Sequence, residues 1–251
     1  MTPAGRTAGR TAGQTDTPAG QTDTPAGQTR TPAAVGIATA TAQVSVAVSG
    51  PDGLAGSLNL RAGRRHGETL APAIRELTRL AGVELRRLEL VAVDVGPGLF
   101  TGLRVGVATA KALASALDIP VVAVSSLDIL AHRLRWTGRP VASVVDARRG
   151  EVFWALYQPA DGEMAAVTEP AVVAPVVLEE ELRRLPGDLL VAGDGARRYL
   201  AEEFDVAPEE FDHPSAAELL ELAATRPALS PEKVTPMYLR GADVRIGWEQ
   251  R

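Results

Sequence analysis

The fold of this chain is decided by the stretch Val93-Asp94-Val95-Gly96-Pro97-Gly98-Leu99-Phe100-Thr101-Gly102-Leu103-Arg104-Val105-Gly106-Val107-Ala108-Thr109-Ala110-Lys111. An apolar run over 90–95 predicts a β-strand, and the glycines and proline after it predict a tight turn. The turn opens an alanine-rich segment, for which we predict a helix over 101–116 with Thr101 as its cap. A strand, a glycine turn and a helix N-terminus in this order are typical of phosphate-binding sites and of ordinary strand-to-helix connections alike.

The glycine spacing argues against the common nucleotide-binding motifs. Gly96, Gly98 and Gly102 do not match G-x-x-x-x-G-K-[ST], and Lys111 lies too far along the chain to serve as the lysine of that motif. The spacing also differs from G-x-G-x-x-G, and no acidic residue stands where that motif places its ribose ligand. As a general nucleotide-binding signal, the turn is therefore weak.

The helix after the turn carries a small residue at every fourth position. Gly102, Gly106, Ala110 and Ala114 share one face, which lets another element approach closely. A glycine inside a helix costs about 0.5–1 kcal/mol relative to alanine, so two of them require a reason. The spacing fits two reasons equally well: close packing on the protein's own sheet, or a subunit interface.

Composition bounds the class of protein. The 251 residues are 45% hydrophobic and 23% charged, which is enough for one large domain or two lobes. The net charge of −5 argues against unaided nucleic-acid binding, which depends on Lys and Arg. The absence of cysteine excludes disulfides and zinc thiolates, and no apolar run reaches the about 18 residues that span a membrane. We expect a soluble, cytoplasmic protein.

The chain divides into an extension and two units. Residues 1–33 are a low-complexity repeat of small and polar residues, for which we predict disorder. Hydrophobic periodicity predicts an N-terminal α/β lobe over 34–138 and a C-terminal α/β lobe over 139–251. The predicted strands are 34–40, 43–49, 53–60, 90–95, 121–124, 141–145, 151–157, 171–177 and 189–192. The predicted helices are 68–80, 101–116, 126–134, 178–184, 196–203 and 215–224.

No catalytic constellation is visible in the sequence. Asp94 and Asp146 each lie at a strand end, where acidic residues often act in α/β folds, but neither has a second carboxylate at a useful spacing. Ser125 and Ser126 have no adjacent base. We therefore predict no catalytic residue and no cofactor in this chain.

A metal site is also not expected. His66, His132 and His213 are far apart in sequence, and Leu70 stands where a second zinc-binding histidine would follow His66. We predict that His66 is a surface or capping residue.

The stretch over 96–106 resembles a known family signature. It is similar to the Gly-Pro-Gly-Ser-Phe-Thr-Gly-Leu-Arg-[Ile/Val]-Gly sequence of the TsaB family, also called YeaZ. Segments 110–114, 124–127, 146–153, 193–195 and 236–240 also resemble the family, so that the resemblance runs in order from about residue 34 to residue 241. The signature-loop residues are Gly96, Pro97, Gly98, Phe100, Thr101 and Arg104.

The resemblance implies the two-lobed fold of actin-like and sugar-kinase-like ATPases, with a mixed sheet and helices in each lobe. The first hairpin of that fold carries an Asp-Thr-Ser-Thr phosphate loop, whereas this chain has Ala38-Thr39-Ala40-Thr41. An alanine neither holds a Mg²⁺-bound water nor activates a nucleophile. The helix after His66 also lacks the second metal-binding histidine of the catalytic relative, TsaD. Both differences imply a subunit that supports catalysis in TsaD without performing it.

The resemblance further implies a role in forming N6-threonylcarbamoyladenosine at position 37 of ANN-decoding tRNAs. The chain would dock TsaD as a heterodimer, stabilise its active form and help to recruit the ATPase TsaE, with tRNA reached through the complex. Without TsaD, the same exposed face is expected to pair as a homodimer. In the family the first two helices of the N-terminal lobe form this interface. We assign it here to Leu70, Ile74, Leu77, Gly102, Leu103, Gly106, Val107 and Ala110, some of which must also pack on the sheet.

Two other functions remain as alternatives. One is a stand-alone ATP-dependent phospho- or acyl-transferase of the same fold, against which the alanine at position 38 argues. The other is a glycoprotease, against which the lack of a metal motif, a cysteine and a serine–histidine pairing argues.

Overall fold

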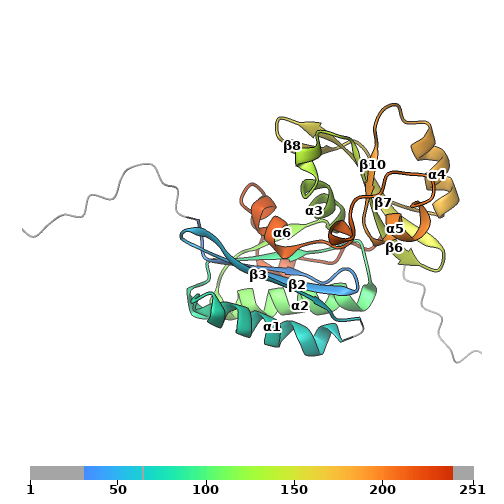
Figure 1. The fold of residues 1–251 in the computed structure, drawn as a ribbon. Helices are drawn as coiled ribbons and strands as arrows, with labels where there is room; N and C mark the ends of the chain where they lie inside the picture. Colours follow the sequence, from blue (N-terminus) through green and yellow to red (C-terminus); the bar gives the residue numbers. More distant parts are fainter. Residues whose placement is uncertain (1–30, 64, 240–251) are drawn as a thin grey trace, which may run out of the picture.

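The computed structural model describes residues 31–63 and 65–239, which form two α/β units (Figure 1). Residues 1–30 of the predicted disordered extension and residues 240–251 of the predicted second lobe lie outside the described residues. Each unit is built on a mixed β-sheet, so the predicted α/β class is confirmed.

The first sheet has the strand order β3-β2-β1-β4-β5. The first three strands are antiparallel neighbours joined by short turns, whereas β4 and β5 run parallel to β1 because helices connect them. The strand bounds are Ala34–Ala38 (β1), Gln43–Gly50 (β2), Gly53–Arg61 (β3), Leu90–Asp94 (β4) and Val121–Val124 (β5).

Helices cover both faces of the first sheet (Figure 1). α1 (His66–Leu80) and α2 (Phe100–Leu117) pack on one face, where their apolar side chains join the strand valines in one buried cluster. α6 (Ala216–Ala223) covers the opposite face, where Leu219 packs in a second cluster with residues of β4 and β5. The first sheet is thus the middle layer of three.

The second sheet has the strand order β10-β6-β7-β8, and β9 pairs with β7. β10 runs parallel to β6, while the remaining pairs are antiparallel. The bounds are Val141–Arg148 (β6), Glu151–Ala160 (β7), Glu163–Ala166 (β8), Ala171–Val173 (β9) and Leu190–Ala192 (β10).

The second sheet is also covered on both faces. α3 (Ser126–His132) packs on one face, and α4 (Pro175–Arg183) and α5 (Asp194–Tyr199) pack on the other. Ser125 caps α3, because its side chain accepts a hydrogen bond from Leu127 N. Short 3₁₀ helices lie at Leu85–Arg87, Arg135–Thr137, Glu209–Phe211 and Pro231–Lys233.

One helix from each predicted lobe packs on the sheet of the other lobe. All strands of the first sheet precede residue 139 and all strands of the second sheet follow it. However, α3 lies before that residue and packs on the second sheet, while α6 lies after it and packs on the first. The two sheets therefore each receive one helix from the other side of residue 139.

Most predicted bounds shift by a few residues, and two of the differences have a plain physical cause. The predicted strand 171–177 ends at Val173, because Pro175 begins α4 with a fixed φ that suits the first helical position. The short strand β8 was not predicted, because its residues are mostly exposed and carry no apolar alternation.

The C-terminal strap, which we define as residues 228–239, runs back along α2. Leu229 and Val121 exchange backbone hydrogen bonds at the edge of β5. The Lys111 Nζ of α2 donates to the carbonyl oxygens of Glu232 and Val234 at 3.2 and 3.0 Å. Met237 N donates to Val95 O at 2.7 Å, which brings the end of the strap to the glycine turn after β4.

Candidate functional site at the signature loop

The signature loop, Gly96 to Arg104, closes over the turn between β1 and β2. Leu99 N donates to Ala40 O at 2.6 Å, and Thr39 Oγ1 donates to Gly102 O at 2.8 Å. Thr39, Ala40 and Thr41 are buried. This turn corresponds to the phosphate loop of the fold that the sequence resembles, and the chain's own atoms cover it.

Three glycines allow this closure. A Cβ atom would lie 2.2 Å from Ala40 O at Gly98, 2.1 Å from Thr39 O at Gly102 and 2.2 Å from Thr39 Oγ1 at Gly106. No real side chain tolerates such distances, so any larger residue would push α2 away from the turn. The small face of α2 therefore packs on the protein's own first hairpin.

The predicted interface residues are buried in the isolated chain. Leu103 lies against Gly96 of the signature loop, and the others lie against the first sheet or the β1–β2 turn, so they offer little side-chain surface to a partner. The spacing left packing and interface as equal alternatives for the small face of α2, the resemblance favoured the interface, and the structure shows this face packed on the β1–β2 turn. The residues concerned are Leu70, Ile74, Leu77, Gly102, Leu103, Gly106, Val107 and Ala110.

The outward faces of the same two helices carry different residues. On α2 they are mainly small, and α1 adds small and charged side chains. A helix face without bulky side chains permits the close approach of another helix. The exposed residues include Glu68, Ala71, Pro72 and Arg75 of α1, and Thr101, Arg104, Ala108 and Ala112 of α2.

Thr101 does not cap α2, contrary to the prediction. The helix begins at Phe100, its N-cap residue is Leu99, and no side chain makes a capping hydrogen bond. Thr101 therefore lies inside the first turn and is exposed. Phe100 and Arg104 are exposed beside it, with the Arg104 guanidinium carbon 3.8 Å from the centre of the Phe100 ring. The loop bends at Gly96, whose φ of 100° favours glycine.

Asp94, the last residue of β4, helps to hold the signature loop in place through hydrogen bonds. Its Oδ1 accepts hydrogen bonds from Ser126 Oγ at 2.6 Å and from Gly96 N at 2.9 Å. Ser126 N in turn donates to Gly96 O at 2.8 Å. Asp94 and Ser126 are fully buried, and this burial raises the pKa of Asp94 to about 7. The pair fixes the loop relative to the start of α3.

The pairing of Asp94 with Ser126 was not predicted from the sequence. The signal was present, because Asp94 ends β4 and Ser126 follows β5, and these strands are parallel neighbours. The carboxyl ends of parallel strands meet at one edge of a sheet, which brings residues far apart in sequence together there. Both groups are inaccessible to solvent, so the pair has a structural role in this chain.

The turn between β6 and β7 is also occupied by the chain itself. Asp146 Oδ1 accepts a hydrogen bond from Arg148 N at 2.8 Å. Its Oδ2 pairs with the guanidinium groups of Arg148 at 3.1 Å and Arg198 at 2.9 Å. The Asp146 carboxylate is buried while both arginines are about half exposed. An internal carboxylate thus takes the N–H and guanidinium donors that an external anion would need.

Asp194 supports the same turn from the start of α5. Its Oδ1 accepts a hydrogen bond from Asp146 N at 2.9 Å. Burial raises the pKa of Asp194 to about 6, and the neighbouring charge of Asp146 acts in the same direction. The Gly193 φ of 111° lets the chain turn into α5 close against β6.

The histidines do not form a metal centre. His66 is buried rather than exposed, contrary to the prediction, and its Nε2 lies 2.8 Å from Thr41 O. It therefore helps to hold the β1–β2 turn. His132 Nε2 lies 3.0 Å from the Glu221 carboxylate and joins α3 to α6. Among residues 31–63 and 65–239, no cluster of three or more His, Cys, Asp or Glu could hold a metal ion.

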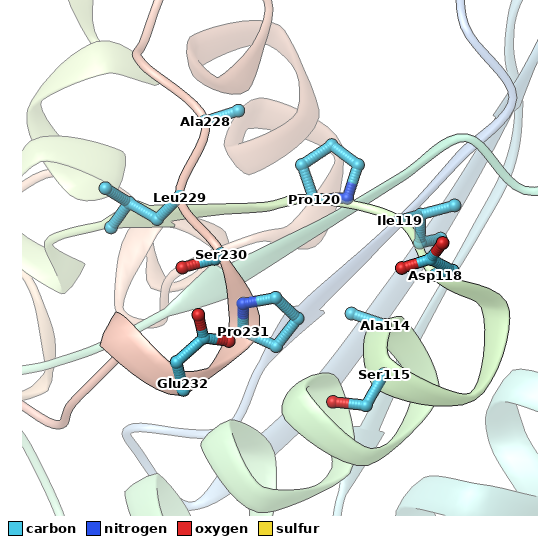
Figure 2. A pocket seen from close by; sticks show the side chains of 10 residues that line it. All are labelled: Ala114, Ser115, Asp118, Ile119, Pro120, Ala228, Leu229, Ser230, Pro231 and Glu232. Atoms are coloured by element: carbon cyan, nitrogen blue, oxygen red, sulfur yellow. The ribbon is translucent and has the colours of Figure 1, made fainter.

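An open pocket of about 500 Å³ lies between the C-terminal end of α2 and the C-terminal strap. Figure 2 shows the side chains that line it. Pro120, Leu229 and Pro231 give it apolar walls, and Asp118 and Glu232 contribute carboxylates. It lies at the opposite end of α2 from the signature loop and includes none of the predicted site residues.

Within the described part of the chain, no helix has both the length and the hydropathy that crossing a bilayer requires.

Comparisons with known proteins agree with the signature. The family model described as "TsaD: tRNA N6-adenosine threonylcarbamoyltransferase" matches residues 56–185. The chain is 29% identical over 225 residues to "tRNA threonylcarbamoyladenosine biosynthesis protein TsaB" of Escherichia coli, covering 85% of this chain and 96% of that protein. It is 30% identical over 192 residues to the Bacillus subtilis protein of the same name, covering 74% of this chain and 84% of the relative.

A solved structure gives the same result for the fold. The structure titled "YeaZ from Pseudomonas aeruginosa" matches with a TM-score of 0.72 and 32% sequence identity, covering 83% of this chain and all of that one. The two mixed sheets with their helices are therefore the fold of that structure. With its signature loop, its fold and these similarities, this chain belongs to the TsaB (YeaZ) family.

Proposed function

We propose that this chain is a non-catalytic subunit of the complex that forms N6-threonylcarbamoyladenosine in tRNA, and that it docks and activates TsaD. TsaD transfers the threonylcarbamoyl group in this proposal, TsaE is recruited to the assembled complex, and tRNA is reached through the complex. The names of the Escherichia coli and Bacillus subtilis relatives support a role in tRNA threonylcarbamoyladenosine biosynthesis. The assignment of the chain to a supporting role rests on the closed β1–β2 turn.

The closed turn argues against nucleotide chemistry in this chain. Ala38 stands where the phosphate loop of the fold has its aspartate, so no carboxylate is available for a Mg²⁺-bound water. Gly98, Gly102 and Gly106 bring the backbone of the signature loop and α2 into contact with the turn. A phosphate group would have to displace the chain's own backbone to reach the turn. At the second hairpin, Asp146 already engages the available donors.

The outward faces of α1 and α2 are the surface that we propose for TsaD. This assignment replaces the buried residues that the sequence predicted, while keeping the same two helices. Small exposed residues such as Ala71, Ala108 and Ala112 allow helices of a partner to approach closely. The same face would pair two copies of the chain when TsaD is absent.

Reconstitution with cognate TsaD tests the proposal. Purified chain and TsaD are mixed, and their association, ATP turnover and tRNA modification are compared with those of each protein alone. We expect a stable heterodimer and modification that needs both proteins, together with TsaE. Unaided tRNA modification or ATP turnover by this chain would contradict the proposal and favour the alternative, a stand-alone ATP-dependent transferase.

A surface substitution tests the docking face without touching the core. Ala108→Glu adds a bulky charge to the exposed side of α2, so we expect it to abolish TsaD binding while thermal stability is unchanged. Val176→Glu is the matched control, because Val176 is 60% exposed on α4 of the other sheet. If the Ala108→Glu variant binds TsaD as the wild type does, the interface lies elsewhere.

A further inference from the structure

Two aromatic side chains from distant segments stand exposed together at the N-terminal end of α2. Phe100 is 54% exposed and Tyr238, from the C-terminal strap, is 49% exposed. Their ring centres are 5.6 Å apart, and the ring planes are inclined by 38°. Exposed aromatic pairs of this kind are uncommon on a surface that contacts only water.

Arg104 completes the cluster from the next turn of α2. Its guanidinium carbon lies 3.8 Å from the centre of the Phe100 ring, and its Nε donates to the Tyr238 hydroxyl at 3.2 Å. One face of the guanidinium lies on the Phe100 ring, and its Nε is hydrogen-bonded to the Tyr238 hydroxyl. The two Nη groups are the donors that remain. Neither Nη group makes a hydrogen bond or ion pair with any residue that the structure describes.

The cluster is held in place before any partner arrives. Met237 N is bonded to Val95 O at 2.7 Å, which fixes the backbone beside Tyr238. Lys111 ties the preceding part of the strap to α2 through the carbonyl oxygens of Glu232 and Val234. Side chains that are already ordered lose less entropy on binding, so the contacts that they make contribute more to affinity.

The charge that α2 contributes to this cluster favours an anionic partner group. The charged residues of α2 are Arg104 and Lys111, and the strap carbonyls already engage the Lys111 ammonium. Arg104 is therefore the charge that this helix presents beside Phe100 and Tyr238. A planar guanidinium with a free edge matches a carboxylate in two parallel hydrogen bonds.

A second arginine–aromatic pair differs from this cluster, because its guanidinium has hydrogen-bond and ion-pair partners within the chain. Arg135 lies 4.1 Å from the ring centre of Trp136, which is 78% exposed. Its guanidinium is engaged by the Glu221 carboxylate at 2.7 Å and by His132 O at 2.8 Å. The Arg135 pair is therefore internally neutralised, whereas among the described residues no carboxylate pairs with Arg104.

From this geometry we infer that Phe100, Arg104 and Tyr238 anchor a carboxylate side chain of the partner subunit. Arg104 binds the carboxylate through its Nη edge, and the two rings pack against the apolar stem of the same residue and its neighbours. Aromatic and arginine residues of this kind dominate the affinity of many interfaces. The inference rests on the proposed docking of TsaD and assigns a role to the part of the signature that the buried glycines do not explain.

Binding measurements with full-length chain and cognate TsaD test the anchor. Calorimetry compares the wild type with Phe100→Ala, Arg104→Lys and Tyr238→Phe. We expect Phe100→Ala and Arg104→Lys to weaken binding by at least about 10-fold, because lysine keeps the charge but not the planar, bidentate edge. Tyr238→Phe removes the hydroxyl that orients Arg104 and should weaken binding by about 3-fold. A fourth variant, Arg104→Gln, removes the charge and should also weaken binding, by an amount that shrinks as salt is raised.

The matched control is Trp136→Ala, which removes an exposed aromatic residue under an arginine at a different site. We expect its affinity for TsaD to equal that of the wild type, and all variants to keep the wild-type melting temperature. If the wild type binds TsaD and the Phe100 and Arg104 variants bind equally well, the anchor is wrong while the docking proposal stands. If the wild type does not bind TsaD, both fail. Variants that lose affinity for tRNA but not for TsaD would overturn the anchor and assign the cluster to RNA.

Discussion

The β1–β2 turn and the β6–β7 turn are the first antiparallel hairpin turns of their sheets. A different kind of interaction holds each turn in place. The β1–β2 turn is buried and uncharged, and glycines of the signature loop and α2 contact its backbone. The β6–β7 turn is exposed, and it is held by the charges around Asp146. Close packing therefore stabilises the first turn, and ion pairs stabilise the second.

This difference predicts unequal tolerance to change. Close packing leaves no room for even one methyl group, because protein interiors are nearly void-free. Ion pairs between a buried carboxylate and half-exposed arginines adjust to substitution, because water solvates whatever is left unpaired. The following changes test the comparison in order of expected effect.

The largest effect is expected from Gly102→Ala. Its Cβ would lie 2.1 Å from Thr39 O, so α2 must move away from the sheet. We expect a loss of about 4 kcal/mol in the free energy of unfolding, measured by chemical denaturation. Gly67→Ala is the control, because a Cβ at this exposed position in α1 meets no atom within 4 Å. It should be neutral or stabilising by up to about 1 kcal/mol. Equal stability of the Gly102 variant and the wild type would refute the packing role of the small face.

The second-largest effect is expected at Asp94, the buried carboxylate that is hydrogen-bonded to the signature loop. The pKa of Asp94 is raised to about 7 in the folded chain, so between about pH 4 and pH 7 the folded state binds more protons than the unfolded state. Stability should therefore fall as the pH rises through this window. Asp94→Asn keeps the acceptor for Ser126 and Gly96 without a charge. We expect this variant to gain about 3 kcal/mol relative to the wild type between pH 4 and pH 8, measured by denaturation at each pH. Parallel pH profiles of the two proteins would contradict the prediction.

A smaller effect is expected at the second turn. Asp146→Ala removes a buried carboxylate but leaves two half-exposed arginines that water can solvate. We expect a loss of about 2 kcal/mol in the free energy of unfolding. Asp188→Ala is the control, because Asp188 is 80% exposed in its ion pair with Arg139 and should change stability by less than about 0.5 kcal/mol. A loss at Asp146 as large as that at Gly102 would remove the distinction between the turns.

The smallest effect is expected from Arg198→Gln. Arg148 still pairs with Asp146 in this variant, and the lost guanidinium is 55% exposed. We expect a change below about 1 kcal/mol, measured as a small shift in melting temperature that disappears at high salt. A large, salt-independent loss would mean that packing, rather than charge, secures the second turn.

Local patterns predicted most of the strands and helices, because alternation and helical spacing are local properties of the chain. They did not predict which face of α2 is buried, and the reason lies in its composition. α2 carries small or apolar residues on both faces, with Gly102 and Gly106 inside and Ala108 and Ala112 outside. A helix that is apolar all round has no single preferred buried face, so periodicity did not select between packing and interface.

Long-range contacts limited the rest of the prediction. The exchange of α3 and α6 between the sheets, and the pairing of Asp94 with Ser126, depend on where the chain travels between elements. His66 was misplaced for the same reason, since its partner is the Thr41 carbonyl oxygen of the preceding hairpin. None of these contacts is encoded in the spacing of neighbouring residues.

Residue identity alone was sufficient for two conclusions. Ala38 has no carboxylate, and no packing arrangement can supply one from that side chain. The glycines of the signature loop mark a position where backbones approach closely, because larger residues would collide there. Folding in three dimensions was needed to reveal what approaches those glycines, and to bring Arg104 and Tyr238 together across 134 positions of sequence. Such contacts arise from the path of the whole chain, which no local pattern contains.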